Sequence, residues 1–86
     1  MHDLHAADKI VKVVLSEAAK RRLKRVNEIV IDLGQVVEHG AEILPENLQF
    51  NITMLARGSV AEGAQVVVNK VRGTDLRIRE IDGTPA

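Results

Sequence analysis

The fold of this chain is decided by residues 26–33, which read VNEIVIDL and are followed by Gly34. Apolar and acidic side chains alternate there and so point to opposite faces of a strand: Ile29, Ile31 and Leu33 against Glu28 and Asp32, with Val30 between the two acids. One buried and one wet face is typical of a sheet that is covered on a single side. We therefore expect a strand here, ended by Gly34.

Two helices are expected around this strand. Apolar residues recur at spacings of three and four from residue 4 to about residue 23, which predicts an amphipathic helix. Asp3 fits the N-cap of this helix, where its carboxylate can accept from the first-turn N–H groups. A second helix is predicted to begin at Pro45 and to end at Gly58. Residues 35–44 have no clean period and are expected to form a loop.

The second half of the chain predicts two further strands. Residues 66–71 and 76–81 are rich in apolar and β-branched residues, and residues 72–74 between them indicate a tight turn, so a hairpin is expected. The predicted fold class is α+β, with two helices packed on one face of a three-stranded mixed β-sheet in the order αβαββ. We expect a single domain over residues 1–82 and a short tail at 83–86.

Composition excludes several classes of function. Twelve basic and twelve acidic residues balance, and Phe50 is the only aromatic residue, which argues against nucleic-acid binding. Without cysteine the chain forms no disulfide, thiol nucleophile or cysteine-ligated zinc site. No segment reaches the ~20 apolar residues of a membrane span. No nucleophile–base pair or phosphate loop is present, so we expect no enzyme, no membrane partner and a cytoplasmic location.

The first residues carry the pattern of a metal chelate. A free Met1 amine, the peptide nitrogen of His2 and its Nδ1 atom could close two fused rings around one cation and occupy three corners of a square plane. Nitrogen ligands in that geometry suit Ni(II) or Cu(II) better than zinc. Because these nitrogens must lose protons, binding should strengthen as the pH rises. The alternative is a frayed terminus without a ligand.

Two further histidines are candidate ligands. His5 lies one helical turn after His2 and is a possible fourth ligand, although a solvated first-turn side chain is the preferred interpretation. His39 lies in the expected loop without a neighbouring ligand spacing, and is interpreted as a surface histidine.

Four segments in order along the chain carry a family resemblance: residues 1–4 (MHDL), 32–34 (DLG), 45–50 (PENLQF) and 58–64 (GSVAEGA). With them the chain resembles the HypA-type nickel metallochaperones, which help to mature nickel–iron hydrogenase and sometimes urease. The resemblance implies a nickel site at Met1, His2 and Asp3. It also implies a nickel-delivery GTPase and the hydrogenase large subunit as partners.

The chain departs from the family pattern in three ways. Residues 35–44 form a segment a few residues longer than usual, which brings in His39. Asp3 stands where the family has a glutamate, one methylene longer. Family members carry a four-cysteine zinc ribbon between the last two strands, where this chain has only residues 71–74. We therefore expect Ni(II) and no zinc. The predicted function is a nickel metallochaperone-like accessory protein. The alternative is a metal-free interaction or scaffold module of a maturation complex, which could self-associate through exposed strand edges as a homo-oligomer.

Overall fold

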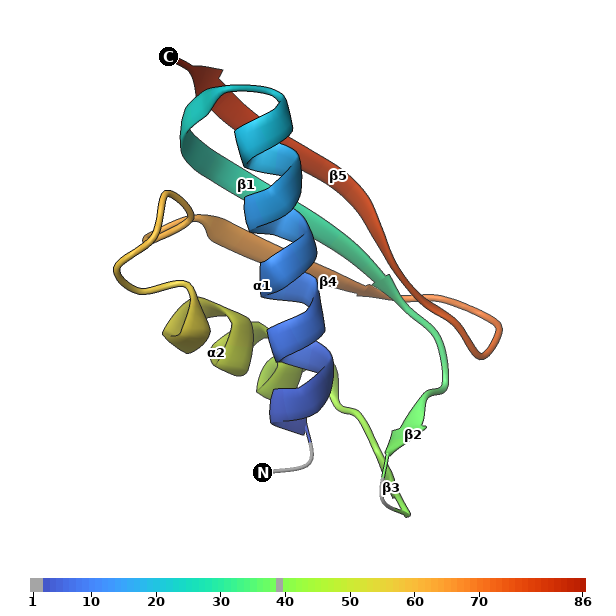
Figure 1. Ribbon diagram of the computed structural model, residues 1–86. Helices are drawn as coiled ribbons and strands as arrows, with labels where there is room; N and C mark the ends of the chain where they lie inside the picture. The colour runs from blue at the N-terminus through green and yellow to red at the C-terminus, as the bar shows by residue number, and fades with distance from the viewer. Residues whose placement is uncertain (1–2, 39) are drawn as a thin grey trace.

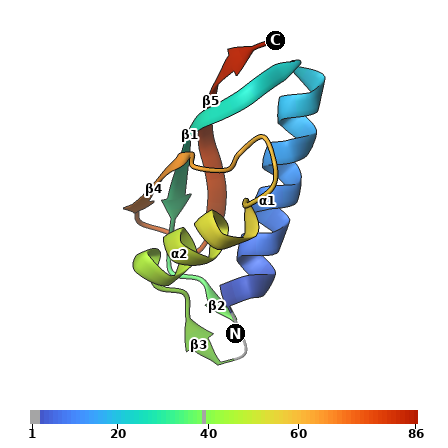
Figure 2. The ribbon, with the colours of Figure 1, turned by 90° about the vertical axis from the view of Figure 1, so that its left-hand side faces the viewer.

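Two helices cover one face of a three-stranded sheet in the computed structural model, which describes residues 3–38 and 40–86 (Figures 1 and 2). A separate two-stranded hairpin lies at the end of the molecule where the first helix begins. The elements follow one another as α1 (Asp3–Lys20), β1 (Leu23–Leu33), β2 (Val37–Glu38), β3 (Ala41–Glu42), α2 (Pro45–Leu55), β4 (Gln65–Lys70) and β5 (Leu76–Pro85). The predicted α+β class and its two-helix, mixed-sheet architecture are confirmed.

β1 is the central strand of the sheet, whose order is β4-β1-β5. It pairs with β4 in parallel and with β5 antiparallel. The buried side predicted for β1 is confirmed, because Ile29, Ile31 and Leu33 are fully buried under the helices; Asp32, which the pattern places on the opposite, solvent-facing side, is also buried. A strand with a neighbour on each side and helices on one face is the natural place for the longest apolar alternation in the sequence.

The expected hairpin between the last two strands is wrong. β4 and β5 lie on opposite sides of β1 and do not pair with each other. The chain between them crosses the end of β1, where Gly34 N–H donates to the Asp75 carbonyl and Gln35 N–H to the Gly73 carbonyl, both at 2.8 Å. A short turn between two apolar strands predicts a hairpin by local rules. In the structure both strands pair with β1 instead, and the backbone of β1 is thereby hydrogen-bonded to a neighbouring strand on each of its two sides.

A bulge in β5 changes which of its side chains face the helices. Ile31 pairs with Ile78 and Val30 pairs with Glu80, which leaves Arg79 as the extra residue. An inserted residue shifts the two-residue period by one. Ile78 and Ile81 consequently share the helix-facing side, opposite Ile31 and Ile29.

Several boundaries differ from those predicted. α1 ends at Lys20 and β1 begins at Leu23, because the chain reverses through Arg22, whose φ is 54°. α2 begins at Pro45 as expected but ends at Leu55, with Ala56 as its C-cap. β5 runs on to Pro85, which pairs with Leu23, so most of the expected tail is part of the sheet.

The expected loop at 35–44 contains a small hairpin. Val37 pairs with Glu42, and Glu38 with Ala41, to form β2 and β3. Strands of two residues are too short to give a period in the sequence. The hairpin is anchored to the rest of the molecule by Ile43, which is fully buried in the core.

The core is aliphatic and lies between the helices and the sheet. α1 contributes Val14 at its centre, α2 contributes Leu48 and Ile52, and all three are fully buried. Leu48 and Ile52 are four residues apart and so lie on the same, inward side of α2. Neither of the two helices, within the described residues, is long and apolar enough to cross a membrane.

Candidate metal-binding end and adjacent groove

The predicted chelate lies at the beginning of α1. Met1 and His2 are outside the described residues, and so is His39. Asp3, the third predicted ligand, is the first residue of α1. The predicted metal site at Met1, His2 and Asp3 therefore stays a prediction.

His5 is the one predicted ligand whose side chain is described. It lies in the first turn of α1 and is exposed to solvent. Among residues 3–38 and 40–86 no group of three or more histidine or acidic side chains comes close enough to hold a metal ion.

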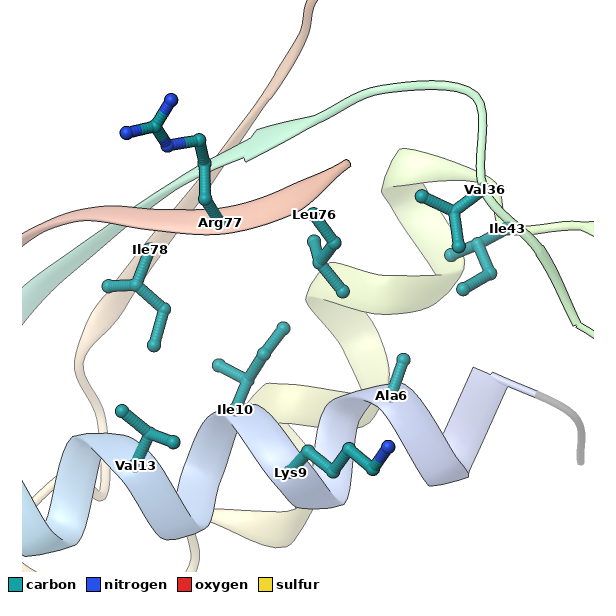
Figure 3. A pocket seen from close by; sticks show the side chains of 9 residues that line it. All are labelled: Ala6, Lys9, Ile10, Val13, Val36, Ile43, Leu76, Arg77 and Ile78. Atoms are coloured by element: carbon teal, nitrogen blue, oxygen red, sulfur yellow. The ribbon is translucent and has the colours of Figure 1, made fainter. Parts of the chain in front are cut away.

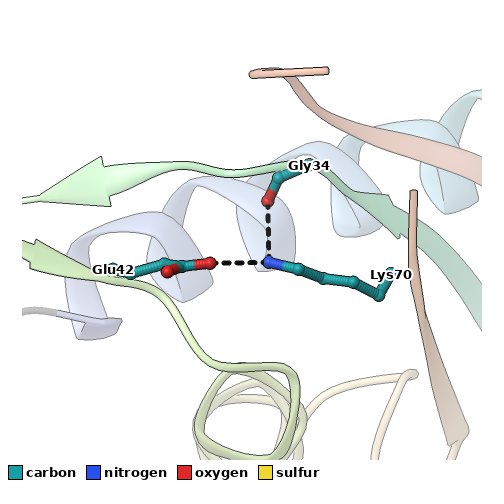
Figure 4. A network of polar contacts seen from close by, with 3 residues as sticks. All are labelled: Gly34, Glu42 and Lys70. Carbon is teal, nitrogen blue, oxygen red and sulfur yellow. Dashed lines mark hydrogen bonds and ion pairs between the residues drawn. The ribbon is translucent and has the colours of Figure 1, made fainter. Parts of the chain in front are cut away.

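The hairpin β2–β3 flanks the beginning of α1. Ala6 lines one depression together with Val36 and Ile43, which stand before and after the hairpin. The hairpin is tied to the sheet by Lys70, whose Nζ donates to Glu42 Oε2 at 2.8 Å and to the Gly34 carbonyl at 3.5 Å (Figure 4). One lysine at the end of β4 thus holds β3 near the end of β1. The segment beside the predicted chelate is consequently not a free loop.

The same depression continues as a groove between α1 and β5, which we name the α1–β5 groove (Figure 3). Its volume is about 460 Å³. Its walls are apolar except for two cations, and are formed by Ala6, Lys9, Ile10, Val13, Val36, Ile43, Leu76, Arg77 and Ile78. Figure 3 shows Val13 and Ile78 facing each other from the two sides.

Sequence reasoning missed this groove. The apolar stripe predicted for the first helix contains Val11 and Val14 but leaves out Val13, which is 54% exposed. A valine beside the stripe rather than on it is a weak signal of a second apolar surface, because single exposed apolar residues are common. The groove itself depends on the position of β5 and could not be derived from local pattern.

These features define a small α+β binding module with a helix start at one end. The chain belongs to the family described as "Hydrogenase/urease nickel incorporation, metallochaperone, hypA", whose model matches residues 1–81.

Curated relatives agree with this family. The chain is 33% identical to the hydrogenase maturation factor HypA of Caldanaerobacter subterraneus over 84% of its own length and 60% of the relative's. It is 31% identical to the HypA of Archaeoglobus fulgidus over 90% of its own length and 66% of that relative's length. It is 36% identical to the HypA of Pyrococcus furiosus over 78% of its own length and 45% of that relative's length. The chain thus spans roughly half to two thirds of the length of these relatives.

Proposed function

We propose that this protein is a non-enzymatic nickel metallochaperone that binds Ni(II) at its amino end and delivers it during hydrogenase maturation. The observation that carries the proposal is that the match to the nickel-incorporation family begins at residue 1 and so includes the Met1-His2 start. The helix that follows begins at Asp3, so an ion bound as we propose would lie near the start of α1.

The ligands we propose are the Met1 amine, the peptide nitrogen and Nδ1 of His2, and a contribution from Asp3. Three nitrogen ligands occupy three corners of a square-planar site and leave the fourth corner open to another ligand. Such an incomplete site favours transfer over storage, because an incoming ligand can bind before the first ones leave. Zinc has no role in the proposal, since the chain has no cysteine.

His5 stands as the possible fourth ligand. It lies in the first turn of α1, close in sequence to Met1 and His2, and its side chain is exposed rather than held in the core. We nevertheless propose that it is mainly solvated and that the fourth corner is filled by water or by a partner. Its contribution to affinity should then be small.

The proposed partners are a nickel-delivery GTPase and the hydrogenase large subunit, met in the cytoplasm. The exposed side of α1 is the docking surface we favour, because an ion held at the start of α1 would be presented beside it. Nucleic acid is not a proposed partner, since basic and acidic residues are equal in number.

Calorimetric titration with nickel sulfate tests the proposal. We expect one ion per chain for the wild type, and loss of binding both in His2→Ala and in a chain extended by two residues before Met1, which converts the amine to an amide. His5→Ala is the matched control on the same helix turn and should still bind. If the wild-type chain binds no nickel, the proposal fails and the metal-free interaction module remains.

A further inference from the structure

We propose that the end of the molecule where α1 turns into β1 binds an acidic segment of a partner protein. We name residues 20–25 the basic end, because five of these six residues are cations: Lys20, Arg21, Arg22, Lys24 and Arg25. The rest of the chain carries seven cations and twelve acids, a net charge of −5. The chain as a whole is neutral because a strongly basic end balances an acidic remainder.

The helix accounts for only part of this charge. Cations in the last turn of a helix stabilise its dipole and stay solvated, which explains Lys20 at the end of α1. Arg21 is used within the molecule, where its Nη1 donates to the Ile81 carbonyl at 2.9 Å. Lys24 and Arg25, however, lie in β1. Both are exposed, and neither forms an ion pair within the part of the chain that the structure describes.

Arg22 occupies a backbone position that favours glycine. Its φ is 54°, in the left-handed region, and its N–H donates to the Ala19 carbonyl at 3.1 Å where α1 ends. Glycine is the usual residue at such a helix end, because a Cβ is unfavourable there. A cation kept at this position indicates that the charge itself is used.

Lys24 and Arg25 line a depression together with residues of the loop at 58–63. Its volume is about 650 Å³. The loop is held against β1 by a hydrogen bond from Val26 N–H to the Val60 carbonyl at 2.8 Å. A Cβ at Gly63 would lie 3.6 Å from Arg25 Nη2, so this guanidinium lies beside a position that has no side chain. The depression therefore has room for side chains of a bound segment next to two cations.

The other side chains in the depression fit an acidic segment that also carries an apolar residue. Glu62 is the one acid that lines it, and its Oε1 accepts from Gly58 N–H at 3.0 Å, so this carboxylate is engaged by its own loop. Val60 is 40% exposed and offers an apolar contact. Arg25 can hold a carboxylate with two N–H groups, and Lys24 can hold one as a point charge.

The surroundings of the basic end favour a short segment over a long polyanion. Acids border it on three elements: Glu17 precedes it on α1, while Glu28 of β1 pairs with Asp82 of β5. A nucleic acid or an anionic membrane would extend past the cations and meet these acids. The depression also has no aromatic side chain on which a base could stack. An acidic protein segment a few residues long matches the size of the basic end.

The basic end lies far from the proposed nickel ligands. α1 has 18 residues, and at 1.5 Å per residue its two ends are about 27 Å apart. Figures 1 and 2 show the start of α1 and the turn into β1 at opposite ends of the molecule. A partner bound at the basic end would leave the start of α1 accessible. The inference needs no metal, so its test is independent of the nickel titration.

Fluorescence anisotropy in metal-free buffer tests the proposal. The probe is a labelled ten-residue peptide in which acidic residues flank two leucines, and its control has every acid replaced by the amide. We expect the wild-type chain to bind the acidic peptide at least about tenfold more tightly than the amide peptide. Lys24→Glu combined with Arg25→Glu should weaken binding of the acidic peptide at least about tenfold. Lys9→Glu combined with Arg72→Glu makes the same change in net charge away from the basic end, and should stay within about twofold of wild type.

Arg22→Gly separates the charge from the fold. We expect its urea midpoint to equal or exceed that of the wild type, because glycine suits the left-handed backbone. Its affinity for the acidic peptide should nevertheless fall about threefold. A role in folding alone would give the opposite result, a lower midpoint and unchanged binding.

Three outcomes would overturn the proposal. The first is a wild-type chain that binds the acidic and the amide peptide equally. The second is binding that is unchanged both in Arg22→Gly and in the Lys24 and Arg25 double variant, which would make these cations a solvated surface. The third is tighter binding of a labelled oligothymidine or of phosphatidylserine vesicles than of the acidic peptide, which would assign the basic end to nucleic acid or to a membrane surface.

Discussion

Arg79 Nε donates to Asp32 Oδ2 at 3.0 Å and connects β5 to the central strand on the face of the sheet away from the helices. Asp32 is only 8% exposed, although the sequence pattern had assigned it to a wet face. Its second oxygen, Oδ1, is buried without a hydrogen-bond partner among the described residues. The carboxylate therefore depends on one arginine, which the β5 bulge supplies.

Replacing that arginine should be costly. Arg79→Ala leaves a buried carboxylate unpaired, and we expect a loss of about 1–2 kcal/mol in the free energy of unfolding. The value is below that of a fully buried pair because the Arg79 side chain is 62% exposed. Urea unfolding at low protein concentration measures it. Arg57→Ala, at an exposed arginine that follows α2, is the control and should change stability by less than about 0.5 kcal/mol.

The same Arg79→Ala change made in an Asp32→Asn variant separates the charge interaction with Asp32 from the packing of the Arg79 side chain. In Asp32→Asn the charge is gone and the shape is kept, so adding Arg79→Ala should cost clearly less than in the wild type. Equal losses in both backgrounds would show that Arg79 stabilises the protein through its aliphatic stem instead.

Gly34 is predicted to be intolerant of any side chain. A Cβ at this position would lie 2.7 Å from the Gly73 carbonyl oxygen and 2.9 Å from that of Asp75, and backbone cannot move aside as a side chain can. Gly34→Ala should lower the free energy of unfolding by about 1–3 kcal/mol. The adjacent, exposed Gln35→Ala should have little effect. Equal stability of the Gly34 variant and wild type would mean that the turn at 73–75 is loosely held.

Removing Glu42 should free the hairpin without unfolding the domain. The Lys70–Glu42 pair is exposed, so Glu42→Ala is expected to cost less than about 1 kcal/mol globally. Amide exchange at residues 37–42 should nevertheless become faster, because the described ties of β3 to the sheet pass through Lys70 (Figure 4). Glu46→Ala, in the first turn of α2, is the control. Unchanged exchange would show that Ile43 alone anchors the hairpin.

Nickel affinity should rise with pH through the neutral range. The Met1 amine and the His2 peptide nitrogen must lose protons to bind, so protons compete with the metal at low pH. Titrations between pH 6 and 9, in steps of about one unit, check this. His5→Ala should keep the same pH profile with an affinity within about threefold of wild type. A profile that flattens in this variant would make His5 a ligand.

Local chemistry in the sequence accounts for much of the fold. The alternation at 29–33 fixed which side of β1 is buried, the three-and-four spacing gave α1, and Pro45 marked the first residue of α2. These features follow from the period of a single strand or helix, which neighbouring residues determine. The same holds for the exclusion of cysteine chemistry and for the Met1-His2 pattern, which are properties of composition and order alone.

Tertiary structure decided how the strands meet. Whether β5 pairs with β4 or with β1 depends on which partner completes the ladders around the central strand, and a short turn permits both choices. The bulge at Arg79, the burial of Asp32 and the groove beside Val13 all follow from that pairing. Each joins residues far apart in the sequence, and no local period carries information about such contacts.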